Sequence, residues 1–298
     1  MTLKNIAIGS LIALSLLAPS WVRAEDRPST ALYSDSRLVV RDRFSDEIVG
    51  QGPDLVLIPG LASSRATWKG TADRLKAHYR LHLIQLAGFA GEAPRANGSG
   101  EVVVPTAEAL DAYLVEQHLA PAVVVGHSLG GTMALYLAEH HGDHLKKVLL
   151  VDALPFFAVI MGGPAATAAG MKPMADQIRA STASSMPGAQ IAARMVSAPD
   201  DRAMVAGWAD SSDPGTVNRA FADDLVLDMR AGLASIRVPV TLLYPDSKQP
   251  AGTVDGLYAD AFAPVPHKTL VRIDNSLHFI MLDQPDRFAA ALDAFLKG

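Results

Sequence analysis

The sequence of 298 residues contains no cysteine. The chain can therefore form no disulfide bond and has no thiol to act as a nucleophile or a metal ligand. The lack of a cysteine after the apolar N-terminal stretch also argues against a lipid-anchored lipoprotein. Stability has to come from the hydrophobic core alone.

Aromatic residues are few, at 6%, and basic residues are not in excess: 26 Lys and Arg stand against 31 Asp and Glu, for a net charge of −5. No basic stripe is interleaved with aromatic residues, so we expect no nucleic-acid partner. The composition, 49% hydrophobic and 19% charged, is that of a globular protein. A chain of this length can bury one large core, and we expect one domain that can carry an insertion.

The N-terminal stretch resembles a secretory signal peptide. Lys4 provides a positive start, residues 6–19 form an apolar run, and Val22 and Ala24 are small residues at the spacing of a cleavage site. We therefore expect cleavage after Ala24, an exported protein in the periplasm or outside the cell, and no stable membrane anchor once residues 1–24 are removed. The alternative, a transmembrane anchor, would need a longer uninterrupted apolar run.

Apolar segments then alternate with segments of helical periodicity. The expected strands are at 54–60, 80–91, 122–125, 146–153, 238–244 and 268–274, and the expected helices at 64–79, 107–119 with Thr106 as its cap, 132–141 and 284–297. Strands that alternate with helices of this length are typical of crossover connections. The sequence therefore predicts an α/β fold with a mostly parallel, doubly wound sheet.

The alternation stops between residues 155 and 230, which contain no convincing strand. The segment is rich in Ala, Gly and Ser and holds seven of the ten methionines: Met161, Met171, Met174, Met186, Met195, Met204 and Met229. We expect a helical cap at 155–230, inserted into a core formed by 25–154 and 231–298. The methionines are either ordinary packing residues between helices or a pliable apolar wall over a substrate pocket.

The stretch "VVVGHSLGG" places Ser128 between an apolar strand and a helix, with Gly126 and Gly130 on either side of it. This Gly-x-Ser-x-Gly spacing is typical of a sharp turn that exposes the serine hydroxyl as a nucleophile. The amide of Leu129 would then point into the site from the positive end of the following helix. A serine hydroxyl also needs a base within hydrogen-bond reach.

Of the nine histidines, His278 is the best candidate for that base. It follows the last expected strand, at the edge where the carboxyl ends of parallel strands meet and where open α/β sheets carry their chemistry. His127 is next to the serine, but we expect its side chain to leave the turn in another direction and to pack.

The segments "LVLIPGLASS", "LAGFAG", "VVVGHSLGG", "IRVPVTLLY" and "LHFIMLDQPDRF" occur in an order that resembles the α/β-hydrolase superfamily, from residue 55 to the C-terminus. The resemblance implies Ser128 as nucleophile, His278 as general base, and the amides of Leu61 and Leu129 as oxyanion hole. Many members have His-Gly where this chain has Pro59-Gly60. A main-chain amide is the donor there, so the difference should matter little.

The acid that orients the histidine has two candidates. Most members of the superfamily carry it after the strand that corresponds to 238–244, where a strict overlay gives Lys248 and where Asp246 lies two residues earlier. Some relatives carry it after the strand that follows the nucleophile's helix, where Asp152 stands. Chain order allows both, and we prefer Asp246 with Asp152 as the alternative. Asp274 is too close to His278 in the chain to turn back easily.

The sequence shows no pattern for a cofactor or a metal, because no histidine and carboxylate pair falls at ligand spacing on a convincing helix. The expected function is a serine hydrolase that cleaves a small apolar carboxylic ester or lactone through an acyl-enzyme on Ser128. The alternatives are an acyltransferase with the same site and an inactive protein of the same fold that binds a small ligand.

Overall fold

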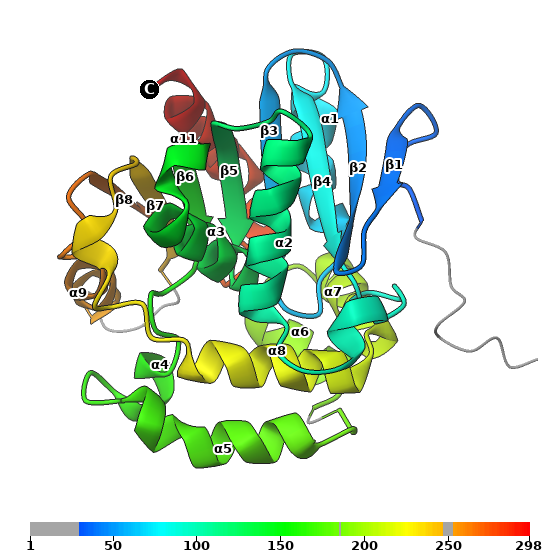
Figure 1. Ribbon diagram of the computed structural model, residues 1–298. Helices are drawn as coiled ribbons and strands as arrows, with labels where there is room; N and C mark the ends of the chain where they lie inside the picture. Colours follow the sequence, from blue (N-terminus) through cyan, green and yellow to red (C-terminus); the bar gives the residue numbers. More distant parts are fainter. Residues whose placement is uncertain (1–29, 185, 247–252) are drawn as a thin grey trace, which may run out of the picture.

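An eight-stranded sheet forms the centre of the computed structural model, which describes residues 30–184, 186–246 and 253–298 (Figure 1). The expected signal peptide, residues 1–24, lies outside the described residues. In chain order the strands are β1 (Arg37–Val40), β2 (Phe44–Gly50), β3 (Asp54–Ile58), β4 (Arg80–Leu86), β5 (Ala122–His127), β6 (Leu145–Val151), β7 (Val240–Pro245) and β8 (Lys268–Ile273).

The strands are arranged in the order β1-β2-β4-β3-β5-β6-β7-β8. β2 pairs antiparallel with β1 and β4, and every pair from β4 to β8 is parallel. The predicted α/β fold with a mostly parallel sheet is confirmed. The antiparallel pair at the edge was not predicted, because residues 30–53 resemble a polar leader in the sequence.

Helices cover both faces of the sheet. The helices of the core are α1 (Lys69–Leu75), α2 (Val103–Glu116), α3 (Leu129–His140), α9 (Thr253–Ala261), α10 (Ile280–Asp283) and α11 (Pro285–Lys297), with 3-10 turns at η2 (Arg65–Trp68), η3 (Arg95–Gly98), η4 (Gly142–His144) and η5 (Leu233–Ser235). α2, α3 and α9 pack on one face and α1 and α11 on the other. Along β3, Val56 and Ile58 face the first layer and Leu55 and Leu57 the second, which explains the continuous apolar run.

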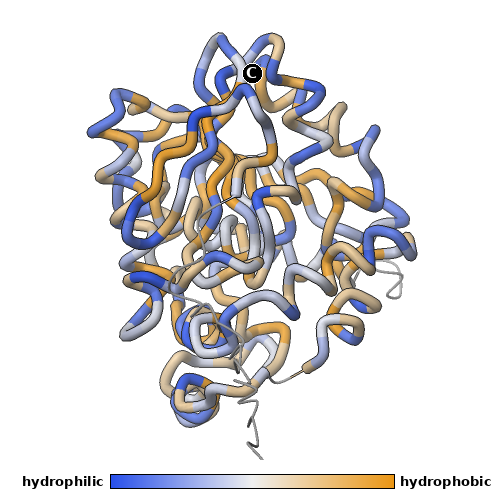
Figure 2. Tube along the Cα trace, turned by 90° about the vertical axis from the view of Figure 1, so that its right-hand side faces the viewer, coloured by the Kyte–Doolittle hydropathy of each residue, from blue (hydrophilic) through white to orange (hydrophobic). Residues whose placement is uncertain are grey.

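Helices alone fill the described residues between β6 and β7, apart from turns and loops. They are α4 (Val159–Gly162), α5 (Ala168–Ala180), α6 (Gly188–Met195), α7 (Pro199–Ser211) and α8 (Pro214–Val226). These helices lie across the carboxyl ends of the parallel strands, with α8 between the sheet and α5 (Figure 1). Figure 2 shows the hydrophobic segments gathered in the sheet and hydrophilic segments toward the outside. No helix within the described ranges is both long and apolar enough to cross a membrane.

The helix expected to begin after Thr106 begins earlier. α2 starts at Val103, and Thr106 lies inside it, fully buried. The carboxylate of Asp223 on α8 accepts hydrogen bonds from the amides of Val102 and Val103, at 2.6 and 3.1 Å. The carboxylate of Asp223 therefore caps the first amides of α2, the role that was expected of Thr106.

Candidate active site

Ser128 occupies the turn between β5 and α3, with backbone angles φ 52° and ψ −121°. A positive φ is strained for a residue with a side chain, and such strain persists only where surrounding contacts hold it. Here the amide of Ser128 donates to the carbonyl of Val151 at 2.9 Å, and its carbonyl accepts from the amide of Thr132 at 2.9 Å. The turn thus has the geometry that exposes a nucleophile at the end of a strand.

The two glycines around Ser128 allow this turn to close. A Cβ on Gly126 would lie 2.2 Å from the carbonyl oxygen of Gly130, and a Cβ on Gly130 would lie 2.4 Å from the carbonyl oxygen of Ile58. Both distances are far below a van der Waals contact. The Gly-x-Ser-x-Gly spacing therefore has a steric cause in this fold.

The two amides predicted for the oxyanion hole are on segments that meet at Ser128. Leu129 is the first residue of α3, and the first amides of a helix have no acceptor within that helix. On the other side, a Cβ added to Gly60 would lie 3.0 Å from the Cβ of Ser128, so the Pro59-Gly60 turn adjoins the serine. Leu61 follows that turn directly.

His278 is hydrogen-bonded to a carboxylate. Its Nδ1 lies 2.6 Å from Oδ2 of Asp152, and the two side chains are 24% and 13% exposed. Asp152 follows β6 with φ 50°, and its amide donates to the carbonyl of Leu243 on β7 at 2.8 Å. The hydroxyl of the buried Tyr258, on α9, donates to the second oxygen, Oδ1. Both oxygens of Asp152 are therefore engaged, one by His278 and one by Tyr258.

The structure thus joins His278 to Asp152, the alternative of the two candidate acids, and does not support the preference for Asp246. Asp246 follows β7, and its amide donates to the carbonyl of Ile273 at 3.0 Å. The negative charges of Asp255 and Asp274, and to a smaller extent that of Asp246, raise the pKa of the solvent-exposed Arg272. The sequence places a carboxylate after each of two adjacent strands, and the loop conformations decide which one reaches the histidine.

His127 packs as expected, and it also contacts the loop of His278. Its Nε2 lies 3.1 Å from the carbonyl oxygen of His278, so this nitrogen carries the proton that is donated. Its ring packs against those of both His278 and Phe279, with centroids 4.6 and 4.5 Å away. Burial, together with the neighbouring His278, holds the pKa of His127 well below its usual range. His127 is therefore a neutral donor that ties the Ser128 turn to the histidine loop, a role that the sequence analysis missed.

Tyr258 is the second residue at this site that the sequence analysis missed. Burial, with the nearby charge of Asp152, raises the pKa of Tyr258 well above its usual range, so the hydroxyl remains a donor. No local motif marks this residue, because 106 positions separate it from Asp152 in the chain. Only the packing of α9 beside β7 and β8 brings the two together.

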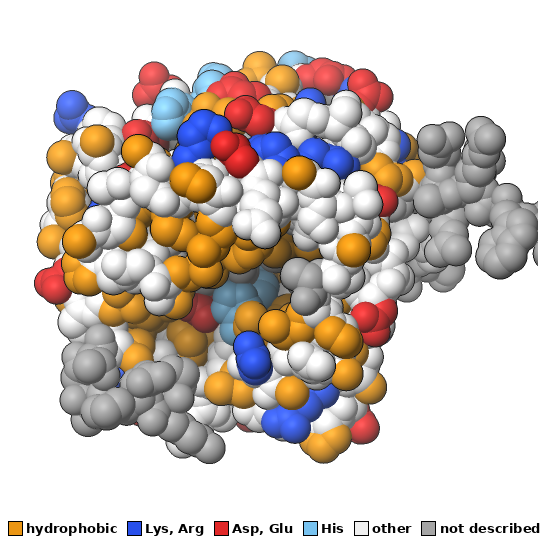
Figure 3. Space-filling model, turned by 90° about the horizontal axis from the view of Figure 1, so that it is seen from below, with side chains coloured by type: hydrophobic (Ala, Val, Ile, Leu, Met, Phe, Trp, Pro, Cys, Tyr) orange, Lys and Arg blue, Asp and Glu red, His pale blue; other side chains and the backbone are white. Residues whose placement is uncertain are grey.

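The cap is attached to the histidine loop. The amide of Phe279 donates to the carbonyl of Met195 on α6 at 3.1 Å, and the rings of Phe279 and Trp208 are 6.4 Å apart. Seen from the side of the cap, the surface is hollowed near its centre, with histidine atoms at the floor and hydrophobic side chains around them (Figure 3). Met229 is buried, whereas Met161 and Met174 are 50% and 42% exposed, so the cap methionines do not share one environment.

Comparison with known proteins agrees with this architecture. The model of the alpha/beta hydrolase family matches residues 55–291, and the chain belongs to that family. Pimeloyl-[acyl-carrier protein] methyl ester esterase of Vibrio vulnificus is 37% identical over 109 residues, which cover 37% of this chain and only 40% of that relative. The corresponding esterase of Aliivibrio salmonicida is 26% identical over 268 residues, covering 83% of this chain and 94% of the relative. A solved esterase from Exiguobacterium antarcticum has the same fold, with a TM-score of 0.71, 22% identity, and coverage of 86% and 96%.

Proposed function

We propose that this chain is a serine hydrolase that cleaves a carboxylic ester, with Ser128 as nucleophile, His278 as general base and Asp152 as the orienting acid. The observation that carries the proposal is the 2.6 Å hydrogen bond between His278 Nδ1 and Asp152, beside a serine held on a strained turn. A carboxylate only accepts, so Nδ1 keeps the proton and Nε2 is left as the acceptor for the serine proton. Membership in the family and the names of the relatives support the same reaction class.

The proposed reaction proceeds through two acyl transfers. Ser128 Oγ bonds to the acyl carbon, its proton passes to His278 Nε2, and the carbonyl oxygen becomes negative. The amides of Leu61 and Leu129 donate to that oxygen, and each such donor is worth about a hundred- to a thousandfold in rate. The C–O bond to the alcohol then breaks as His278 returns the proton to the leaving oxygen. Water attacks the acyl-enzyme in the same way and releases the acid.

A small apolar ester or lactone is the proposed substrate class, because hydrophobic side chains surround the hollow on the cap side (Figure 3). The absence of a carboxylate at position 248, where a strict overlay with the superfamily expects the acid, is the one feature of the sequence that favours an inactive binding protein. The hydrogen bond between Asp152 and His278 supports another explanation, in which Asp152 is the acid.

Covalent labelling tests the proposal. The purified protein should react with a fluorophosphonate probe and release a burst of p-nitrophenol from a short-chain p-nitrophenyl ester. Ser128→Ala should abolish both, whereas the exposed Ser99→Ala, a matched control, should leave both unchanged. A Ser128→Ala protein that still labels and still hydrolyses the ester would overturn the assignment. Formation of a new ester in the presence of an alcohol acceptor would favour the acyltransferase alternative.

We also infer export, on the pattern of residues 1–24. The N-terminus of the protein isolated from a bacterial host should begin at Glu25. Recovery of the whole chain in the cytoplasm, starting at Met1, would contradict this.

A further inference from the structure

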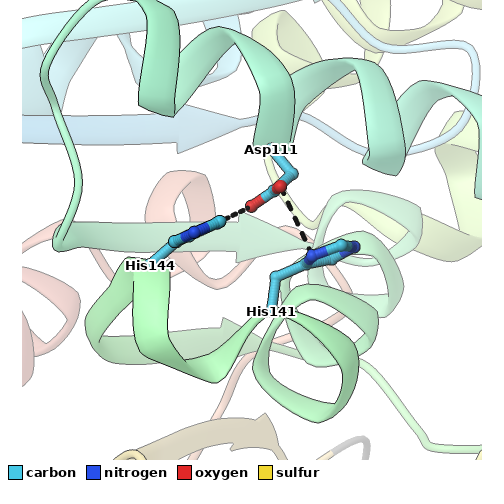
Figure 4. Close-up of side chains that lie close together, drawn as sticks. All are labelled: Asp111, His141 and His144. Carbon is cyan, nitrogen blue, oxygen red and sulfur yellow. Dashed lines mark hydrogen bonds and ion pairs between the residues drawn. The ribbon is translucent and has the colours of Figure 1, made fainter.

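Two histidines and an aspartate come together at the end of α3 that is farthest from Ser128 (Figure 4). His141 follows α3 directly, His144 lies in η4, and Asp111 comes from α2. α3 is 12 residues long, so about 18 Å of helix separates this cluster from the serine turn. Among the described residues, this is the one group of His, Asp and Glu side chains close enough to hold a metal ion.

The spacing of the three side chains suits a transition-metal ion. Asp111 Oδ1 lies 2.8 Å from His144 Nδ1, and Asp111 Oδ2 lies 3.3 Å from His141 Nδ1. With one ligand atom taken from each residue, the three atoms all lie within 4.8 Å of one another. In a tetrahedral zinc site with bonds of about 2.0–2.1 Å, neighbouring ligand atoms are about 3.3 Å apart. Small side-chain rotations therefore suffice to bring these atoms around one ion.

The orientation of His141 also suits a metal ligand. His141 Nε2 lies 3.1 Å from both carboxylate oxygens of Glu108, so this nitrogen donates to Glu108. The other ring nitrogen, Nδ1, faces Asp111 and lies 3.3 Å from its Oδ2.

The contact with Glu108 is also the arrangement that metal-binding histidines have. Such a histidine usually donates its second ring N–H to a carboxylate, which fixes the tautomer and aims the other nitrogen at the metal. Tyr136 in turn donates to Glu108 at 2.7 Å and holds that carboxylate in place. His141 is thus already oriented as a ligand.

We propose that Asp111, His141 and His144 form a site for a divalent transition-metal ion of the zinc class, completed by solvent. Asp111 is 11% exposed, and His141 and His144 are 24% and 39% exposed, which leaves an open side for water. Imidazole nitrogens favour zinc, nickel or copper over magnesium and calcium. The ion would join α2 to the end of α3, so its effect is on stability and not on ester cleavage. The sequence missed this site because Asp111 is 30 residues from His141.

Metal titration of the full chain, made without a histidine tag and freed of metal with a chelator, tests the site. Equilibrium dialysis with zinc should give one bound ion per chain, and zinc or nickel, but not magnesium, should raise the melting temperature. Asp111→Asn and His144→Gln should abolish this binding, and Glu108→Gln should weaken it about tenfold or more. His140→Gln is the matched control, because His140 is adjacent but its Nδ1 bonds to the carbonyl of Tyr136. That variant should bind zinc like the unchanged protein.

Two results would overturn the site. One is an unchanged protein that retains no zinc in dialysis, which would leave an ordinary cluster of ion pairs. The other is an Asp111→Asn protein that binds zinc as tightly as the His140→Gln control. X-ray absorption at the zinc edge of the unchanged, zinc-loaded protein gives a readout that needs no variant. It should report two imidazole nitrogens, and a shell of oxygens alone would refute the ligand set.

Discussion

Replacement of Asp152 by asparagine is the sharpest test of the proposed active site, because it keeps the size of the side chain and removes its charge. Tyr258 donates to Oδ1 of Asp152 and should continue to donate to the amide oxygen of the variant. The amide NH2 group would then face Nδ1 of His278. Nδ1 would have to accept, so the proton would move to Nε2, which could no longer take the proton of Ser128.

The expected loss in kcat is about ten-thousandfold, the effect of the wrong tautomer in triads of this kind. At about 1.36 kcal/mol per factor of ten, this corresponds to about 5.4 kcal/mol of lost transition-state stabilisation. Asp246→Asn is the matched control. It makes the same chemical change after the neighbouring strand, where the charge acts on the exposed Arg272. Asp246→Asn should change kcat by about twofold at most, because that charge acts on Arg272 and not on His278.

The assay is the hydrolysis of a short-chain p-nitrophenyl ester, with kcat and KM measured separately for both variants. A ten-thousandfold loss in Asp246→Asn with a near-normal Asp152→Asn would refute our reading of the geometry. Mild losses in both would mean that the carboxylate on His278 is not part of the catalytic machinery. Circular dichroism and the melting temperature of each variant establish that a loss of rate is not a loss of fold.

A double variant tests the reasoning about the tautomer. In Asp152→Asn with Tyr258→Phe, no phenol holds the amide oxygen away from His278, so the amide can turn and present that oxygen to Nδ1. The double variant should therefore be several-fold more active than Asp152→Asn alone. An activity equal to or below that of the single variant would show that the phenol does not fix the amide.

Three further variants test other parts of the structure. Tyr258→Phe alone should lower kcat about tenfold with little change in KM. A hydrogen bond to a charged group is worth about 1.5–3 kcal/mol, and part of that free energy holds Asp152 in its orientation. An unchanged kcat would contradict that role. Gly126→Ala should lower the free energy of unfolding, measured in urea, by about 3 kcal/mol, because its Cβ would lie 2.2 Å from a backbone oxygen. The matched control is Gly207→Ala, whose Cβ would meet nothing within 4 Å. That control should be neutral or stabilising. Burial raises the pKa of Asp224 to about 7, so the folded state loses stability as the pH rises from about 4 to about 7. Asp224→Asn should remove this loss and be more stable than the unchanged protein at pH 8 by a few kcal/mol, and the difference should shrink toward pH 4. An equal pH dependence of urea unfolding in both proteins would exclude the buried charge of Asp224 as the source of the loss.

The parallel part of the sheet could be predicted from the sequence because its strands are buried on both faces. Such strands are continuous apolar runs. The turn at Ser128 adds two glycines, one required by contact within the turn and the other by contact with β3. β2 could not be predicted in this way, since it contains Ser45, Asp46 and Glu47, all fully buried. Their partners come from elsewhere in the chain: His82 bonds to Asp46 at 2.6 Å.

The sequence also could not decide which carboxylate bonds to His278. Asp152 and Asp246 both follow strands of the parallel sheet, and β6 and β7 are neighbours. Strand order therefore places both carboxylates at the same edge. The selection depends on the left-handed backbone of Asp152, with φ 50°, and on Tyr258, which reaches it from α9. A positive φ at an aspartate and a contact over 106 residues leave no periodic pattern in the sequence.

Two of the three residues of the proposed catalytic site are held by the sheet itself. Ser128 and Asp152 each follow a strand directly, each has a positive φ, and each amide donates to a carbonyl of the neighbouring strand, at 2.9 and 2.8 Å. The strain at both positions is thus balanced by hydrogen bonds that continue the parallel ladder. The cap reaches the site through a contact with Phe279, next to His278. Changes in the cap should therefore alter which ester fits and act on His278 through this contact, whereas Ser128 and Asp152 keep the positions that the sheet gives them.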